Sequence, residues 1–276
     1  MIRTPAVAGQ FYPSSESELG SIIDEFMSSA QVEEGIAKKA VSYVAPHAGY
    51  MYSGRTAAFT YKALSLREGL EDIDTFVIVG PNHTGLGYPV SISGMNWETP
   101  LGAVENDLEL AFAISEESDY ITIDDEAHRL EHSVEVQLPF LQKVIKTPRC
   151  CFICMGDQSI KSSEMLGGSI EVAARKLDRN ITVIASSDFN HYESAGVAKS
   201  KDMPAIKELV KLNYKGFDGK IKKLGDSACG HGPIAVSTIL GKGCGAKEGH
   251  LLRYSNSGDV TGDYASVVAY SSIMFA

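Results

Sequence analysis

FVIVGPNHTGLG, residues 76–87, combines a short apolar run with a Gly-Pro break and a histidine in a glycine-rich loop. Phe76 to Val79 have the length and β-branched content of a buried strand, so we expect the chain to leave the core at Gly80. A single histidine at such a position is most often a solvated or capping residue. His83 becomes informative if other strands end in the same way.

Three further apolar runs end in small or turn-forming residues and then present polar side chains. They are VSYVAPHAGYMYSG at 41–54, CCFICMGDQS at 150–159 and ITVIASSDFNHYES at 181–194. The polar residues that follow these runs are His47, Asp157, Gln158, Asp188 and His191. Ligands of open α/β sheets bind outside the carboxyl ends of the parallel strands. We therefore expect these side chains to share one site at that edge.

Length and charge narrow the class of protein. A chain of 276 residues can form one large α/β domain, and no linker or low-complexity tract divides it, so we expect a single domain over 1–276. The chain has 25 Lys and Arg against 35 Asp and Glu, a net charge of −10. This charge repels a phosphate backbone, so we expect no nucleic-acid partner.

The amino-terminal sequence MIRTPAVAGQFYP lacks the features of a signal peptide, and no segment has the apolar length of a membrane span. We therefore expect a cytoplasmic protein with no membrane partner. Five cysteines in a reducing compartment favour free thiols or metal ligands over disulfides. Cys151 and Cys154 have CxxC spacing but lie within a strand-like run, which predicts packing in the core.

Hydrophobic periodicity predicts helices that alternate with the strands. We expect helices at 14–29, 53–66, 105–115, 131–145, 162–177 and 234–240, an antiparallel excursion around Trp97, and two β-rich runs within 250–275. The strand before His47, the following helix and the strand before His83 form a βαβ unit. Such units build parallel sheets with right-handed crossovers, so the sequence predicts an α/β fold with a largely parallel sheet.

Imidazoles and a thiol are the metal-ligating groups that this arrangement offers. If His47, His83 and His191 converge, three neutral imidazoles suit zinc, iron, copper or nickel, whereas magnesium and calcium prefer oxygen ligands. Cys229 lies in a small-residue turn before a predicted helix, where a thiol is favoured as the ligating thiolate. An ordinary buried cysteine is the alternative at this position.

A local motif competes with this dispersed site. HRLEH, residues 128–132, fits the HxxEH pattern, in which His128 and His132 on one helical face would bind zinc and Glu131 would activate water. This pattern keeps a zinc hydrolase as a weaker alternative. An acidic helix cap is the structural alternative, and in a third interpretation Glu131 and His132 alone line the site.

Eight blocks of sequence, in order along essentially the whole chain, resemble the Memo family. They are RTPAVAGQFYP, APHAGYMYSG, VGPNHTGLG, WETPLG, EHSVEVQLPFL, SSDFNHY, ACGHGPIA and YSNSGDVTGDYASVVAY. This family resembles class III extradiol dioxygenases in fold. The resemblance implies a three-layer α/β/α sandwich with a mixed, largely parallel central sheet and a non-haem iron site at the strand ends.

The resemblance also implies roles for individual residues. The positions that match the family's metal-binding residues are His47, His83 and Cys229. The residues that we expect to be catalytic are His191, Asp188 and His132, with Asp188 orienting His191 as acid or base. The residues that we expect to contact substrate are Glu131, His231, Tyr50 and Asn82. Animal members of the family carry arginine at the position of His231, which makes this histidine an additional candidate ligand.

Two classes of function follow from the resemblance. As an enzyme, the protein would be an oxidoreductase that uses Fe(II), with Cu or Zn as alternatives, on a small molecule or a peptide, and a radical SAM protein is an expected partner. As a binding module, the same pocket would accept a peptide end or an aromatic side chain, as an adaptor does. The lack of basic residues near the site argues against phosphotyrosine capture and favours the enzyme.

Overall fold

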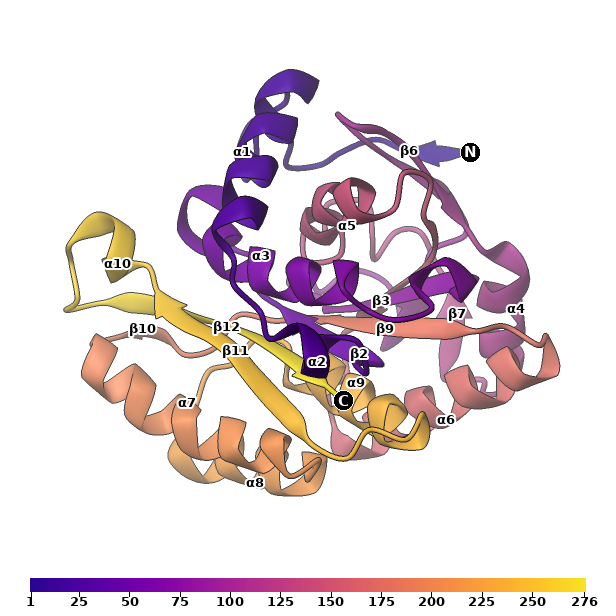
Figure 1. The fold of residues 1–276 in the computed structure, drawn as a ribbon. Helices are drawn as coiled ribbons and strands as arrows, with labels where there is room; N and C mark the ends of the chain where they lie inside the picture. Colours follow the sequence, from indigo (N-terminus) through magenta and orange to yellow (C-terminus); the bar gives the residue numbers. More distant parts are fainter.

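Five parallel strands form the centre of the protein, which is described over residues 1–276 by a computed structural model (Figure 1). Their order across the sheet is β6 (Gly102–Asn106), β8 (Arg149–Met155), β3 (Thr75–Pro81), β9 (Ile181–Ser186) and β2 (Ser42–Ala45). The four runs singled out in the sequence are β2, β3, β8 and β9. The prediction that they form parallel neighbours is therefore confirmed.

Further strands extend this centre on both sides into a mixed sheet of 12 strands. On the β6 and β8 side lie β1 (Ile2–Arg3), β4 (Val90–Ile92), β5 (Asn96–Thr99) and β7 (Ile121–Ile123). On the β2 side lie β10 (His191–Glu193), β11 (Gly249–Asn256) and β12 (Val267–Phe275). The pair β5 and β6 is the antiparallel excursion expected around Trp97, and β11 and β12 are the two expected carboxy-terminal strands.

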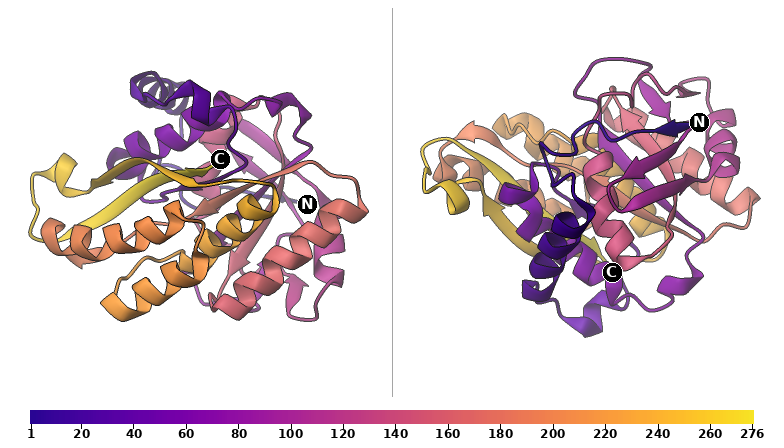
Figure 2. Two further views of the ribbon diagram at one scale, coloured as in Figure 1. Left: turned by 60° about the horizontal axis from the view of Figure 1, so that its bottom comes forward. Right: turned by 90° about the horizontal axis from the view of Figure 1, so that it is seen from above.

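Helices cover both faces of the sheet, which gives the expected three-layer α/β/α arrangement (Figures 1 and 2). One face carries α1 (Glu16–Ser29), α3 (Tyr50–Ser65) and α5 (Leu138–Val144), and the other carries α6 (Ile160–Lys176), α7 (Ala195–Val210), α8 (Tyr214–Leu224) and α9 (His231–Gly243). The remaining helices are α2 (Glu34–Ala37), α4 (Leu108–Glu116), α10 (Gly258–Thr261), η1 (Leu70–Asp72) and η2 (Glu135–Gln137). Every helix is too short or too polar to cross a membrane.

Burial on both faces explains the continuous apolar character of the central strands. In β3, Phe76 and Ile78 pack into the cluster under α1, α3 and α5, whereas Val77 and Val79 pack into the cluster under α6 and α9. A strand with no solvated face has no position for a polar side chain until it ends. The histidines and aspartates of the predicted site accordingly follow the carboxyl ends of these strands.

Two predicted helices begin later than the sequence indicated. The helix expected over 131–145 begins only at η2 and continues as α5, with Pro139 in its first turn and not as an interruption. The Glu131 carboxylate accepts the N–H groups of His132 and Ser133 and holds them outside a helix. The helix expected from residue 105 begins at Leu108. For α7 and α8 the sequence analysis made no prediction.

Candidate functional site

Neighbouring strands deliver the predicted polar residues to one place. β9 lies between β3 and β2, so the segments that follow these strands bring His83, Asp188 and His47 side by side. The ring centroids of His47 and His83 are 5.1 Å apart. Cys229 approaches from the loop before α9, and its Sγ lies 3.2 Å from Nε2 of His47. The ligating atoms of His47, His83 and Cys229 all lie within 4.8 Å of one another.

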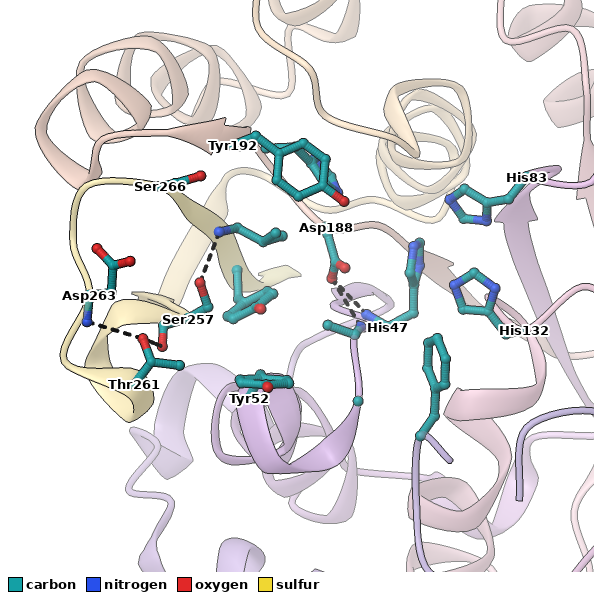
Figure 3. Close-up of a pocket in the computed structure, with 16 residues that line it drawn as sticks. His47, Tyr52, His83, His132, Asp188, Tyr192, Ser257, Thr261, Asp263 and Ser266 are labelled. Atoms are coloured by element: carbon teal, nitrogen blue, oxygen red, sulfur yellow. Dashed lines mark hydrogen bonds between the residues drawn. The ribbon is translucent and has the colours of Figure 1, made fainter. Parts of the chain in front are cut away.

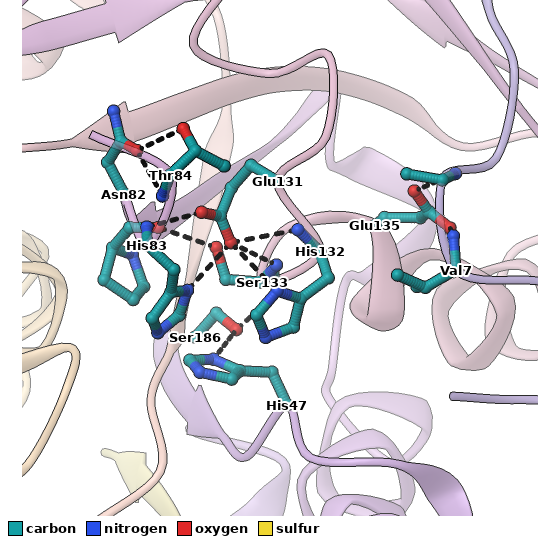
Figure 4. Close-up of polar contacts among 12 residues, drawn as sticks. Val7, His47, Asn82, His83, Thr84, Glu131, His132, Ser133, Glu135 and Ser186 are labelled. Carbon is teal, nitrogen blue, oxygen red and sulfur yellow. Dashed lines mark hydrogen bonds and ion pairs between the residues drawn. The ribbon is translucent and has the colours of Figure 1, made fainter. Parts of the chain in front are cut away.

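The protonation of His47 follows from its partner, Ser186 (Figure 4). Ser186 Oγ lies 2.6 Å from the carbonyl oxygen of Ser133, which can only accept, so the single hydroxyl proton of Ser186 points there. Nδ1 of His47 lies 2.8 Å from the same Oγ and must be the donor. Nε2 of His47 is therefore unprotonated and directs its lone pair toward Cys229. Burial, together with the neighbouring imidazoles, lowers the pKa of His47 and keeps the ring neutral.

Glu131 sets the protonation of His83 in the same way. Nδ1 of His83 lies 2.9 Å from Oε1 of Glu131, and because a carboxylate only accepts, Nδ1 carries a proton, which leaves the lone pair on Nε2 when the ring is neutral. Although burial alone would raise the pKa of Glu131, the hydrogen bond and charge of His83 lower it to about 2. The carboxylate is fully buried and also accepts N–H bonds from the backbone of His83, His132 and Ser133. Its oxygens are thus occupied, and Glu131 orients His83.

Asp188 and Cys229 complete the inner part of the site. Oδ1 of Asp188 accepts the backbone N–H groups of His47 and Ala48, at 2.8 and 3.3 Å, whereas Oδ2 makes no hydrogen bond. Burial raises the pKa of Asp188 to about 7. Burial and the nearby Asp188 also raise the pKa of Cys229, so the sequence-based expectation of a thiolate is wrong for the protein without a bound cation. A cation between the thiol and the imidazoles would reverse this effect.

His132 and His191 lie at the margin of this group. The ring of His132 stacks on that of His83 at a centroid distance of 4.7 Å and lies 4.7 Å from Phe11. Nδ1 of His191 donates to the carbonyl oxygen of Ser227 at 3.1 Å. The expectation that Asp188 orients His191 is therefore wrong, because each of them takes other hydrogen-bond partners. The predicted convergence holds closely for His47 and His83, while His191 lies further along the pocket wall.

These side chains line one end of a cavity of about 600 Å³ (Figure 3). The residues at this end include His47, His83, His132 and Asp188, and His191 also contributes to the wall. The rest of the wall comes from aromatic residues and from the segment around α10, namely Phe11, Tyr52, Tyr192, Tyr270, Ser257, Thr261, Asp263 and Ser266. The cavity is large enough for a small organic molecule.

Two of the residues expected to contact substrate, Tyr50 and Asn82, have structural roles instead. Tyr50, the first residue of α3, points into the core, where it is 2% exposed and its hydroxyl donates to the carbonyl oxygen of Val136. Tyr52 lines the cavity instead. Asn82 accepts the N–H groups of Thr84 and Gly85 and so shapes the loop that carries His83. These contacts depend on loop geometry, which the sequence pattern does not specify.

Glu131, His231 and the end of β8 also differ from expectation. Glu131 has no exposed surface and does not line the cavity. His231 is the first residue of α9, its Nδ1 lies 3.4 Å from the carbonyl oxygen of Ala228, and it belongs to neither the cavity wall nor the donor groups. Asp157 lies outside the site, where it accepts hydrogen bonds from Ser159, the N-cap of α6, and from the hydroxyl of Ser162. Gln158 donates to the carbonyl oxygen of Cys229 at 2.7 Å and holds its loop.

The zinc-hydrolase interpretation of HRLEH is wrong, because these residues are not helical and their histidines point apart. His128 is fully buried, packs edge-on against Trp97 and lies 3.2 Å through Nε2 from the carbonyl oxygen of Ser91. His132 instead stacks on His83 at the cavity. The interpretation in which His132 faces the site and Glu131 supports it fits best.

Residues that were not predicted from the sequence support the histidines from behind. Ser186 is the last residue of β9, and Gln137 lies in η2, where its Nε2 donates to Ser186 Oγ at 2.8 Å and its Oε1 accepts the hydroxyl of Tyr61. These residues could have been found from the sequence because they are polar residues at positions that the hydrophobic periodicity assigns to the core. All three of these residues are essentially unexposed.

Comparison with known proteins agrees with this architecture. The family model described as Memo-like protein matches residues 3–274. A MEMO1 family protein of Methanopyrus kandleri is 43% identical over 284 residues, which cover 100% of this chain and 99% of the relative. A MEMO1 family protein of Thermoplasma volcanium is 44% identical over 277 residues, which cover 99% and 98% of the two chains. The chain therefore belongs to the Memo family, as its eight sequence blocks predicted.

Burial of His128 predicts a loss of stability in mild acid. Its pKa is lowered from 6.5 to about 4, so below the unfolded pKa the unfolded chain gains a proton that the folded protein does not. Stability should fall as the pH decreases between these two values, by up to about 3 kcal/mol for this residue. His128→Gln keeps a donor for Ser91 and removes the titration. Urea unfolding of both proteins across this pH range should show a steeper decline for the wild type, and parallel profiles would contradict the assignment.

Proposed function

We propose that this protein is a metal-dependent oxidoreductase that holds its metal ion through His47, His83 and Cys229. The observation that carries the proposal is the group of three ligating atoms within 4.8 Å of one another, in which Nε2 of His47 lies 3.2 Å from Sγ of Cys229. Ser186 and Glu131 hold the far nitrogens of the two rings. Such partners are typical of metal-ligating histidines because they fix the tautomer and the ring orientation.

The donor set fits a transition metal. Two imidazoles and one thiolate suit iron, copper or zinc, and they do not suit magnesium or calcium. Binding would release the proton of Cys229, since thiolates and not thiols ligate metals. We favour Fe(II), which agrees with the resemblance to extradiol dioxygenases, and the soft sulfur keeps copper as the next choice. The bound ion would supply Lewis-acid and one-electron chemistry next to the cavity.

Residues of the chain itself would bind the substrate and move its proton. Asp188 lines the cavity, its Oδ2 has no hydrogen-bond partner, and its pKa of about 7 suits a base that accepts a proton near neutral pH. His191 has Nδ1 tied to Ser227, so its Nε2 is a second acceptor. Phe11 and Tyr270 add aromatic surface to the cavity wall, and Phe11 packs against His132.

A peptide-binding role for the same pocket is the second candidate. Thr261, Asp263 and Ser266 line the outer end of the cavity and are exposed, so a chain end would be able to enter there. A radical SAM partner stays a prediction of the family resemblance.

Metal analysis tests the ligand assignment. We expect protein purified without oxygen and loaded with Fe(II) to retain one ion per chain, and His47→Ala and His83→Ala to lose it. Glu131→Gln should weaken binding by about 10–100-fold, the usual effect of removing a partner behind a ligating histidine. His231→Ala is the matched control, because this histidine lies outside the donor group. Full metal content in both His47→Ala and His83→Ala would refute the site.

Oxygen uptake tests the enzymatic role. The Fe(II)-loaded protein should consume dioxygen with a member of a panel of phenols and catechols, measured at an oxygen electrode. Asp188→Asn keeps the acceptor for the amides of His47 and Ala48, so it should retain metal but turn over about a hundred- to ten-thousand-fold more slowly. Asp119→Asn, an exposed change of the same charge, should be unaffected. A fully loaded protein without uptake on any compound would favour the binding module.

A further inference from the structure

The cavity is elongated and its two ends differ in chemistry (Figure 3). His83 and His132 lie at one end, and Asp263 lies at the other with Thr261 and Ser266. Tyr52 and Tyr192 stand on opposite sides between these ends.

Tyr192 is held over the cavity in an unusual backbone conformation. Its φ is 62°, in the left-handed region that a bulky residue rarely adopts, and its side chain is largely exposed at 79%. Residues kept in such conformations cluster at ligand-contacting sites. An aromatic wall on each side favours a flat ring as the middle of the ligand.

The wall of the cavity offers neutral hydroxyl and imidazole groups but no cationic donor. None of its 16 lining residues is lysine or arginine. Nδ1–H of His47 and of His83 is directed away from the cavity, at Ser186 and Glu131. The amides of residues 47 and 48, which would otherwise attract an anion, already donate to Asp188.

Two carboxylates leave oxygens free in this wall. Asp188 is 4% exposed, and its Oδ2 has no hydrogen-bond partner in the protein although it lines the cavity. At the outer end, Oδ1 of Asp263 accepts the N–H of Ala265, and Oδ2 has no partner. A carboxylate buried as deeply as Asp188 requires hydrogen-bond donors, which a ligand or water in the cavity would supply.

From this arrangement we propose that the cavity selects aromatic amines, with the ring between Tyr52 and Tyr192 and the ammonium group at Asp263. The proposal rests on the proposed function in one respect, that the histidine end is where the ring substituent reacts. The ammonium group supplies the donors and the positive charge that the outer end lacks, and the tyrosine rings also attract cations. A carboxylate or phosphate in its place would meet Asp263 without a basic partner.

Matched ligands that differ only in the charged end test this inference. Tyramine and 4-hydroxyphenylacetate share a phenol ring and carry an amine and a carboxylate respectively. Calorimetry with the metal-free protein should show that tyramine binds about five- to tenfold more tightly than 4-hydroxyphenylacetate. This is the range expected when a partly exposed carboxylate attracts the charge of one ligand and repels that of the other. Added salt should reduce this preference, because the outer end is open to solvent.

Charge-neutralising variants locate the origin of the preference. Asp263→Asn keeps the acceptor for Ala265 and should remove most of the difference between the two ligands. Asp119→Asn makes the same change in net charge on a distant exposed residue and should leave the difference intact. Three results would each overturn the inference: 4-hydroxyphenylacetate binds as tightly as tyramine or more tightly, Asp263→Asn keeps the full preference, or tyramine does not bind. Because these measurements use the metal-free protein, they test ligand selection independently of the metal site, which is tested by metal analysis.

Discussion

Ser186 donates its hydroxyl proton to the carbonyl oxygen of Ser133, which cannot donate in return. This hydrogen bond decides how His47 is protonated. Gln137 reinforces this contact by donating through Nε2 to Ser186 Oγ, and Tyr61 in turn fixes the amide of Gln137. Gln137 and His47 therefore both donate to Ser186 Oγ, and the Ser186 hydroxyl donates to Ser133. Reversing the tautomer of His47 would leave the single hydroxyl proton of Ser186 between two buried acceptors, Nδ1 of His47 and the carbonyl oxygen of Ser133, and one of them would lose its hydrogen bond, which is costly.

Both imidazoles of the inner site depend on the fold in this way. Ser186 ends β9, the strand between β2 and β3, so it lies behind the two loops that carry His47 and His83. Glu131 belongs to a non-helical segment before η2 that is anchored by Arg3, whose guanidinium donates to the carbonyl oxygens of His128 and Glu131. The lone pairs that face Cys229 are thus a consequence of core packing, and the site is organised before any ligand arrives.

Much of this arrangement could be predicted from the sequence, because continuous apolar runs that end in Gly or Pro identify strands buried on both faces. The same pattern places His47, His83 and Asp188 at one edge. Periodicity cannot tell which way a loop residue turns, so Tyr50 was assigned to the cavity although it packs in the core. It also could not show that Glu131 accepts backbone N–H groups and thereby prevents the helix on which the HRLEH interpretation depended.

The central claim is that His47 and His83 present unprotonated Nε2 atoms to the site before any metal binds. Long-range proton–nitrogen correlation spectra of the ¹⁵N-histidine-labelled, metal-free protein distinguish the two tautomers directly, and Ser186→Ala assigns the signal of His47 by perturbing it. We predict the Nδ1–H form for both residues. An Nε2–H form for either of them would contradict the account, because that ring could not then offer a lone pair to a metal ion shared with Cys229.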